Sequence, residues 1–358
     1  LSPEIWITFP RVQKRPQDIR STSSRSTGGL ALSRSSPVIE RRYQAHLMYR
    51  ADIPVYSVNS PSDDTISHRF GGGITYKGNR FQLDAIDRFL ISYEDRGTGI
   101  STAPSDVDEY KSNFFNTILS YNTRNRFRLR FDYSNYRIDY DDDQNAFRER
   151  TDNTYSAYVF YKLRPKTALF VQYNFIDIHY DDNRPLDSYE HNLFGGVQWD
   201  VTAKTKGLFK AGYGIKEFKN TGEDDSNFLL ETQVHYKFTP KTSFRFLAFS
   251  KTSETDVVQA SHIVSSGIEG EYQQMLTARI TGLARLSYVN DRYNDDFTFG
   301  GQTGERDDNT TQASLGLQYR LRRWLQSSLG YVYERRDSNF DYFDYTSNSI
   351  FLRITGSI

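Results

Sequence analysis

Residues 312–321 read QASLGLQYRL, and their two-residue rhythm decides the fold. One parity is apolar throughout: Ala313, Leu315, Leu317, Tyr319 and Leu321. The other parity carries polar side chains or glycine, so the segment predicts a β-strand with one apolar and one polar face. Residues 126–133 alternate in the same way.

Short basic turns punctuate the strands at one end only. They occur at residues 77–80, 123–126, 164–167, 203–206, 239–242 and 321–324. Long acidic loops fall between them, at what must be the opposite end. A soluble β-sandwich would have tight turns at both ends, whereas short turns facing long loops are typical of an outer-membrane β-barrel.

We therefore expect an all-β protein, a transmembrane antiparallel β-barrel of about 16 strands. The alternation places them near residues 43–57, 66–78, 80–94, 109–122, 125–140, 153–164, 166–180, 187–201, 204–218, 226–238, 241–252, 257–273, 275–290, 309–321, 324–336 and 345–357. An even number puts both termini on the side of the short turns, the periplasmic side.

The composition is compatible with a barrel, although the mean hydropathy of the chain is that of a polar protein. The 358 residues contain no run of apolar residues long enough for a membrane-spanning helix. In a barrel only every second residue faces lipid, and the 26 Tyr and 25 Phe favour strands and membrane interfaces. The absence of cysteine suits an oxidising compartment. No leader peptide is visible at Leu1, so we interpret the chain as mature.

Two regions differ in composition. Residues 1–40 include a Ser/Thr/Arg-rich stretch with too little apolar surface to pack, which predicts a flexible periplasmic arm. The alternative is a segment that folds back into the lumen as a plug or docks a partner. Residues 41–358 form the predicted barrel.

The polar parity, which should line the lumen, is rich in basic residues. The candidate anion-binding residues are Arg126, Arg128, Arg130, Lys210, Arg245, Arg279, Arg285 and Arg353. Few acidic residues share that parity, namely Asp84, Asp132, Asp200, Glu231 and Glu334. Basic side chains inside a pore attract anions, although those near turns could instead extend to the membrane interface.

Aromatic residues also fall on the inward parity. The candidates for stacking on sugar faces are Tyr158, Phe160, Phe170 and Phe194. The alternation of segments 125–140 and 166–180 changes phase midway, near Tyr133 and Phe175. Either a β-bulge or an exit of the strand from the bilayer would explain the change.

No catalytic or metal-binding pattern stands out, so we expect neither an enzyme nor a cofactor. The six histidines are scattered. His191 beside Glu190, or His179 near Asp177, could supply only part of a catalytic group. The acidic loops lack calcium-binding spacing. They are interpreted as solvated surface, or as groups that divalent ions link to lipopolysaccharide.

The turn phrases suggest a family. YKGNRF (76–81), LSYN (119–122), YKLRPKT (161–167) and YKFTPKTS (236–243) resemble the putative β-barrel porin type 2 family, over about residues 66–358. That resemblance implies a bacterial outer-membrane conduit for a secreted polysaccharide. The matching motifs are turns, so no binding residue can be transferred.

These observations predict an outer-membrane channel for an acidic exopolysaccharide. The expected partners are membrane lipids with lipopolysaccharide, the polysaccharide cargo and a separate periplasmic export or scaffold protein, but no nucleic acid. Two alternatives remain. One is a general or anion-selective diffusion porin, which should have a long loop folded into the pore. The other is a structural barrel that holds a partner protein of a secretion, electron-transfer or motility complex.

Overall fold

The computed structural model describes residues 25–36, 42–56, 66–93, 109–123, 126–182, 184–200, 204–255 and 259–356. These residues form one sheet of seventeen strands. The strands are β1 (Arg25–Ser36), β2 (Tyr43–Tyr56), β3 (Ser67–Lys77), β4 (Phe81–Tyr93), β5 (Glu109–Asn122), β6 (Phe127–Tyr140), β7 (Arg150–Arg164), β8 (Thr167–Tyr180), β9 (Ser188–Trp199), β10 (Thr205–Phe218), β11 (Asp224–Thr239), β12 (Thr242–Ser253), β13 (Ile263–Met275), β14 (Ile280–Phe299), β15 (Gln302–Arg320), β16 (Leu325–Ser338) and β17 (Tyr345–Gly356).

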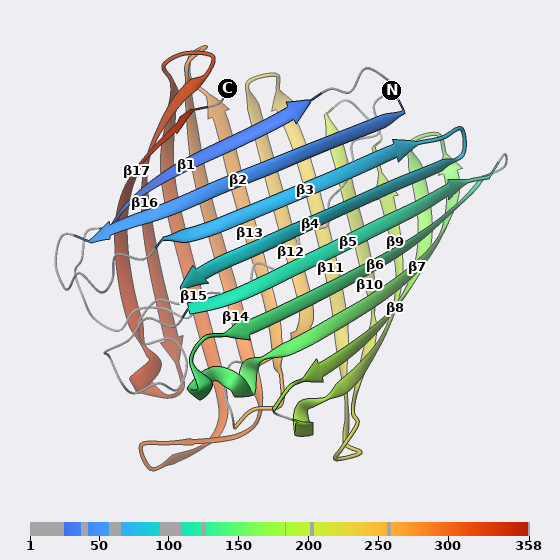
Figure 1. Ribbon diagram of the computed structural model, residues 1–358, viewed down its shortest axis with the longest axis vertical. Coiled ribbons are helices and arrows are strands. Elements are labelled where there is room, and N and C mark those ends of the chain that lie inside the picture. Colours follow the sequence, from blue (N-terminus) through green and yellow to red (C-terminus); the bar gives the residue numbers. More distant parts are fainter. Residues whose placement is uncertain are drawn as a thin grey trace.

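The sheet closes on itself as a barrel (Figure 1). Each strand pairs antiparallel with the next one along the chain, from β1 to β17. β1 then lies against β17 and completes the wall. Because the direction alternates at each step, β1 and β17 run the same way. The barrel predicted from the sequence is confirmed.

The sixteen predicted strands correspond to β2–β17. β1 was not foreseen, and it lies within the stretch 1–40 that the sequence assigned to an arm. Residues 1–24 and 37–40 of that stretch lie outside the described residues. Four predicted boundaries were off by five residues or more, because β13 begins at Ile263, β14 begins at Ile280, and the β14–β15 hairpin continues to Phe299 and Gln302. The outer face of this extension is polar, and its inner face mixes Tyr293 and Phe297 with the buried Arg306 and Asp308. It therefore lacks the apolar outer parity by which alternation located the other strands.

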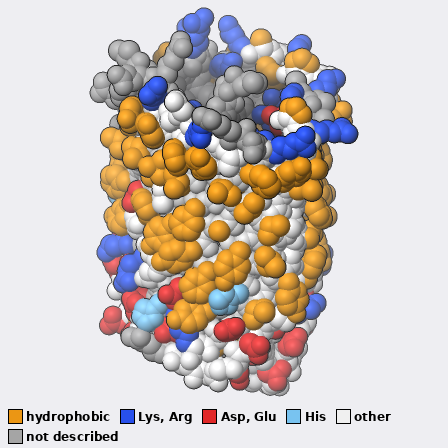
Figure 2. All heavy atoms as spheres, turned by 90° about the vertical axis from the view of Figure 1, so that its right-hand side faces the viewer, with side chains coloured by type: hydrophobic (Ala, Val, Ile, Leu, Met, Phe, Trp, Pro, Cys, Tyr) orange, Lys and Arg blue, Asp and Glu red, His pale blue; other side chains and the backbone are white. Residues whose placement is uncertain are grey.

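The two ends of the barrel differ, and we call them the turn end and the loop end. Tyr43 and Gly356 both lie at the turn end, beside the short turns. The loop end carries the long connections with three 3-10 segments, η2 (Asp143–Arg148), η3 (Arg184–Leu186) and η4 (Asp341–Phe343). Figure 2 shows basic side chains gathered at the turn end, acidic side chains at the loop end and an apolar band between them.

The apolar band consists of one parity of each strand. On β6 the side chains of Phe127, Leu129 and Phe131 face outward and are exposed, whereas Asp132 faces inward and is buried. Exposed apolar residues on the outer surface of a β-barrel face lipid. No helix in the described part of the chain is long and apolar enough to cross a membrane.

Toward the loop end the chemistry of the two faces reverses. On β6, Arg137 and Asp139 face outward while Ile138 and Tyr140 are buried inside. On β8, Asp177 and His179 face outward, and Ile178 and Tyr180 are buried. The pairing of β6 with β7 and of β8 with β9 continues without a register shift. Of the two explanations for the phase change, the strands therefore leave the bilayer, and there is no bulge.

The interior at the loop end is packed like the core of a soluble protein. Ala260, Ile263, Tyr293, Phe297 and Phe340 form a buried apolar cluster. These residues come from the connection after β12, from β13 and β14, and from the connection after β16. Burial of their side chains removes apolar surface from water and fastens the long connections to the strands beneath them.

Candidate functional site

Three predicted aromatic residues, Tyr158, Phe160 and Phe170, meet on the lumen wall of β7 and β8, and the fourth, Phe194, lies on the same face of β9. The ring centroids of Phe160 and Phe170 are 5.2 Å apart, and those of Tyr158 and Phe160 are 5.8 Å apart. Phe160 and Phe170 are buried, as is Phe194 on β9. The alternation thus placed all four on the correct face.

A glycine makes room for this cluster. Gly196 pairs with Phe170 across β9 and β8, and both face the lumen. A Cβ atom on Gly196 would lie 2.5 Å from Cζ of Phe170, well inside van der Waals contact. The missing side chain lets the Phe170 ring lie flat against the wall, as expected for a strand glycine at a close approach.

Cations cover the aromatic faces. The guanidinium carbon of Arg128 lies 3.9 Å from the Phe160 centroid, and that of Arg130 lies 4.9 Å from the Tyr158 centroid. Nζ of Lys210 lies 4.6 Å from the centroid of Phe194. Such contacts are favourable because the ring face is electronegative. Basic side chains of the wall therefore cover the faces of these three rings.

Carboxylates neutralise most of these cations. Arg130 pairs with Asp132, and Nζ of Lys210 lies 2.8 Å from the carboxylate of Glu231. Arg128 instead donates a hydrogen bond of 3.2 Å to Oε1 of Gln198. Both carboxylates were among the acidic residues predicted for this face.

A second group of lumen residues crosses β12, β13 and β14. Glu271 accepts from Arg285 at 2.5 Å and lies 3.5 Å from Arg245, and Arg285 also approaches Glu269 at 3.5 Å. The sequence analysis did not include Glu269 and Glu271 among the inward acids. Its estimate of the basic excess in the lumen was therefore too high.

Two predicted lumen residues were misplaced. Arg126 precedes β6 and donates a hydrogen bond to the Tyr161 hydroxyl at the turn end. Arg279 lies in the turn between β13 and β14, not on a strand. Turn residues do not follow the pleat, so parity counted through a turn is not reliable. Arg353, in contrast, lies on β17 between the outward Leu352 and Ile354 and faces the lumen.

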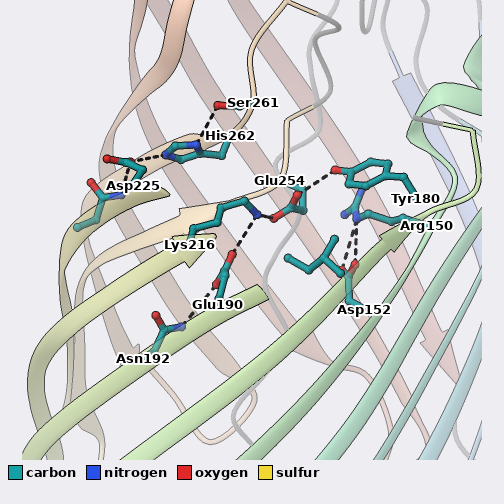
Figure 3. A network of polar contacts seen from close by, with 12 residues as sticks. Arg150, Asp152, Tyr180, Glu190, Asn192, Lys216, Asp225, Glu254, Ser261 and His262 are labelled. Carbon is teal, nitrogen blue, oxygen red and sulfur yellow. Dashed lines mark hydrogen bonds and ion pairs between the residues drawn. The ribbon is translucent and has the colours of Figure 1, made fainter. Parts of the chain in front are cut away.

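The sequence analysis missed a buried ionic network at the loop end, drawn in Figure 3. Nζ of Lys216 on β10 lies 3.3 Å from Glu190 on β9 and 2.6 Å from Glu254 in the β12–β13 connection. The Tyr180 hydroxyl on β8 donates to Glu254 at 2.9 Å. Lys216 shares the inward parity of Lys210, so parity could have revealed it.

His262, at the end of the same connection, is also buried. Its Nε2 lies 2.8 Å from Asp225, and its Nδ1 lies 3.1 Å from the Ser261 hydroxyl. Burial and the nearby Lys216 charge lower the pKa of the His262 imidazole, which favours its neutral form. No spacing in the sequence predicts these contacts.

The residues considered for catalysis do not assemble into one group. His191 faces outward and hydrogen-bonds the Tyr173 hydroxyl at 2.7 Å, while Glu190 faces inward. His179 pairs with Asp187, and Asp177 binds Lys219 instead. Alternation along β9 separates Glu190 and His191 onto opposite faces, whereas Asp177 and His179 share a face of β8 but have different partners.

Three carboxylates at the loop end have ligand atoms within 4.8 Å of one another, those of Asp139, Glu149 and Asp181. Arg137 contacts Asp139 at 2.5 Å and Asp181 at 2.9 Å. Glu149 accepts the backbone N–H of Tyr140. A guanidinium thus already supplies positive charge to this group.

Residues 41–357 match the family described as putative beta-barrel porin 2. The chain belongs to this family. The match covers β2 to β17. It agrees with the resemblance carried by the turn phrases and extends it toward the N-terminus. Together with the apolar band, membership places the protein in the outer membrane and supports a channel.

Solved structures of the FrpB iron transporter share the fold. The FrpB iron transporter from Neisseria meningitidis (F3-3 variant) is 10% identical with a TM-score of 0.51, over 88% of this chain and 62% of the transporter. The apoprotein form of its F5-1 variant is 9% identical with a TM-score of 0.51, over 88% and 61%. The alcaligin receptor FauA from Bordetella pertussis is 10% identical with a TM-score of 0.47, over 91% and 63%.

This chain therefore spans less than two thirds of each of these proteins. At such low identity the likeness to FrpB concerns the fold alone. No curated protein matches the chain.

Proposed function

We propose that the protein is an outer-membrane channel through which an acidic polysaccharide leaves the cell. The observation that carries this proposal is the water exposure of inward-facing arginines. The side chain of Arg245 is 60% exposed and that of Arg285 is 43% exposed, although both face the lumen. Inward side chains can remain this exposed only where the lumen holds water.

These arginines lie toward the turn end of the lumen. Arg245 is near the start of β12, Arg285 near the start of β14 and Arg353 near the end of β17. Outer-membrane barrels have their short turns in the periplasm. The exposed cations would then line the periplasmic entrance, where they attract a polyanion such as a chain of uronic acids.

This orientation also accounts for the charge of the two ends. The acidic loop end would face the cell surface, in contact with lipopolysaccharide through its exposed groups. Tyr43 and Gly356 would lie on the periplasmic side, where a separate export or scaffold protein could deliver the polysaccharide.

A diffusion porin is the second candidate, because the first two residues after β12 lie inside the lumen. Glu254 and Thr255 follow β12 and are buried among residues of the inner wall. We expected such a loop to be long in a porin, whereas the connection between Ser253 and Ile263 is short. The inward position of Glu254 and Thr255 nevertheless resembles the constriction that a porin needs.

Disruption of the gene distinguishes the two functions. If the channel exports polysaccharide, the mutant should lose acidic glycan from the cell surface and accumulate it in the periplasm, and the intact gene should restore secretion. Normal surface glycan together with slower uptake of small anions would contradict export and favour a diffusion porin. Surface glycan is measured by uronic acid assay of washed cells and of periplasmic extract.

A further inference from the structure

Arg128 differs from the other basic residues that cover the aromatic rings of the lumen wall. Its neighbour Arg130 pairs with Asp132. Within the described residues Arg128 forms no ion pair, and its one hydrogen bond there, 3.2 Å long, goes to the amide oxygen of Gln198. The positive charge of Arg128 is therefore available to an anion in the lumen.

The Arg128 side chain is held in place although it has no carboxylate beside it. Its guanidinium carbon lies 3.9 Å from the centroid of Phe160, a ring that is itself only 3% exposed. The hydrogen bond to Gln198 draws the guanidinium from β6 across β7 and β8 to β9. A cation that is fixed before its ligand arrives loses little conformational entropy on binding.

Most of the hydrogen-bonding capacity of this guanidinium is unused. An arginine side chain carries five N–H donors, and Nη2 of Arg128 uses one of them for Gln198. Nε is buried without a partner, whereas Nη1 has no partner among the described residues and is not buried. The two terminal nitrogens present the planar fork that matches the two oxygens of a carboxylate.

The wall beside Gln198 also favours an anionic sugar. Lys162 on β7, Ala168 on β8 and Gln198 on β9 lie in register on the inner face. Lys162 has no ion pair in the described part of the chain and adds a second positive charge. Ala168 between them carries only a methyl group, so it extends little into the lumen. The amide nitrogen of Gln198 can donate to a sugar hydroxyl, because only its oxygen bonds Arg128.

We propose that Arg128 and Gln198, with Lys162 beside them, form a binding subsite for the carboxylate of an acidic sugar. Arg128 binds both carboxylate oxygens through Nη1 and Nη2, and Gln198 donates to a hydroxyl of the same sugar. The three residues lie at the turn end of β6, β7 and β9, where the polysaccharide would enter. This inference rests on the channel function proposed above and names the residues that recognise the cargo.

Current block by a trimer of galacturonic acid tests the subsite in planar bilayers. The trimer should interrupt the current of the wild-type channel, and the neutral trimer maltotriose should not. Arg128→Gln removes the charge and the fork together. Because hydrogen bonds to a charged group contribute more than neutral ones, this variant should shorten the blocks by about tenfold.

Two further variants separate recognition of the carboxylate from simple attraction. Arg128→Lys keeps the positive charge but not the planar fork, so it should shorten the blocks nearly as much as Arg128→Gln. Lys237→Gln is the matched control. Lys237 shares the inward parity of Glu231 on β11 and lies at the same end of the lumen, but away from the subsite, so its loss should leave the block duration as in the wild type.

Calorimetry on the detergent-solubilised barrel measures binding of the galacturonate trimer without any current, and heat-modifiability on gels verifies that each variant is folded. The wild type should bind the trimer about tenfold more tightly than Arg128→Gln. Equal affinities would overturn the subsite, and so would full retention of binding by Arg128→Lys. Binding that depends on Arg128 in a barrel that carries no current would instead contradict the channel function and leave the subsite intact.

Discussion

Arg245 and Arg285 share the carboxylate of Glu271 on the lumen wall, and Glu269 lies beside them. Replacement of both arginines by Gln would leave the two carboxylates without these cations in a water-filled passage. The field in the lumen should then change sign locally. We expect the permeability ratio of chloride to potassium to fall several-fold, measured from the reversal potential across a salt gradient.

Arg335→Gln is the control for this selectivity change. Arg335 lies on β16 and pairs with Asp337 at an exposed position near the loop end. It shares the outward parity of Leu329 and Tyr331, so its loss should not alter selectivity. An unchanged reversal potential in the double lumen variant would contradict the role of the basic residues.

At the scale of one element, β8 shows how a strand divides between lipid and water. Val171 and His179 share its outward face, but Val171 lies within the apolar band and His179 beyond it. Val171→Arg should destabilise the barrel by about 2–4 kcal/mol, whereas His179→Arg should cost roughly 0–1 kcal/mol because it lies near water. Urea unfolding in lipid vesicles measures both. Equal costs would contradict the membrane boundary that the change in polarity defines.

At the scale of the whole molecule, the described residues form a barrel of seventeen strands, an odd number. β1 joins β17 in parallel, but β2 and β17 run in opposite directions and have the relation that an antiparallel pair requires. Deletion of residues 25–36 should therefore leave a barrel that closes between β17 and β2, with lower thermal stability. If the shortened chain still closes, it should keep a compact, heat-modifiable form on gels. A chain that fails to fold would show that β1 is an essential part of the wall.

Much of this architecture could be predicted from the sequence because its signals are local. Period-two alternation located sixteen strands, and short basic turns defined one end. Parity also put Arg128, Phe160 and Lys210 on the lumen face, since the pleat determines which way a side chain points. The strand β1 escaped because its residues lack a clear apolar face, and Arg279 was misplaced because turns interrupt the pleat.

The sequence by itself determined which residues face lipid and which face the lumen. Only the tertiary structure decided which lumen residues meet, and hence how much of their charge remains. Glu271 on β13 neutralises arginines on the strands to either side of it, β12 and β14. Glu254, which follows β12, reaches Tyr180 on β8. Alternation reports the direction of a side chain on its own strand, but contacts across the lumen depend on how the closed sheet and its connections bring distant segments together.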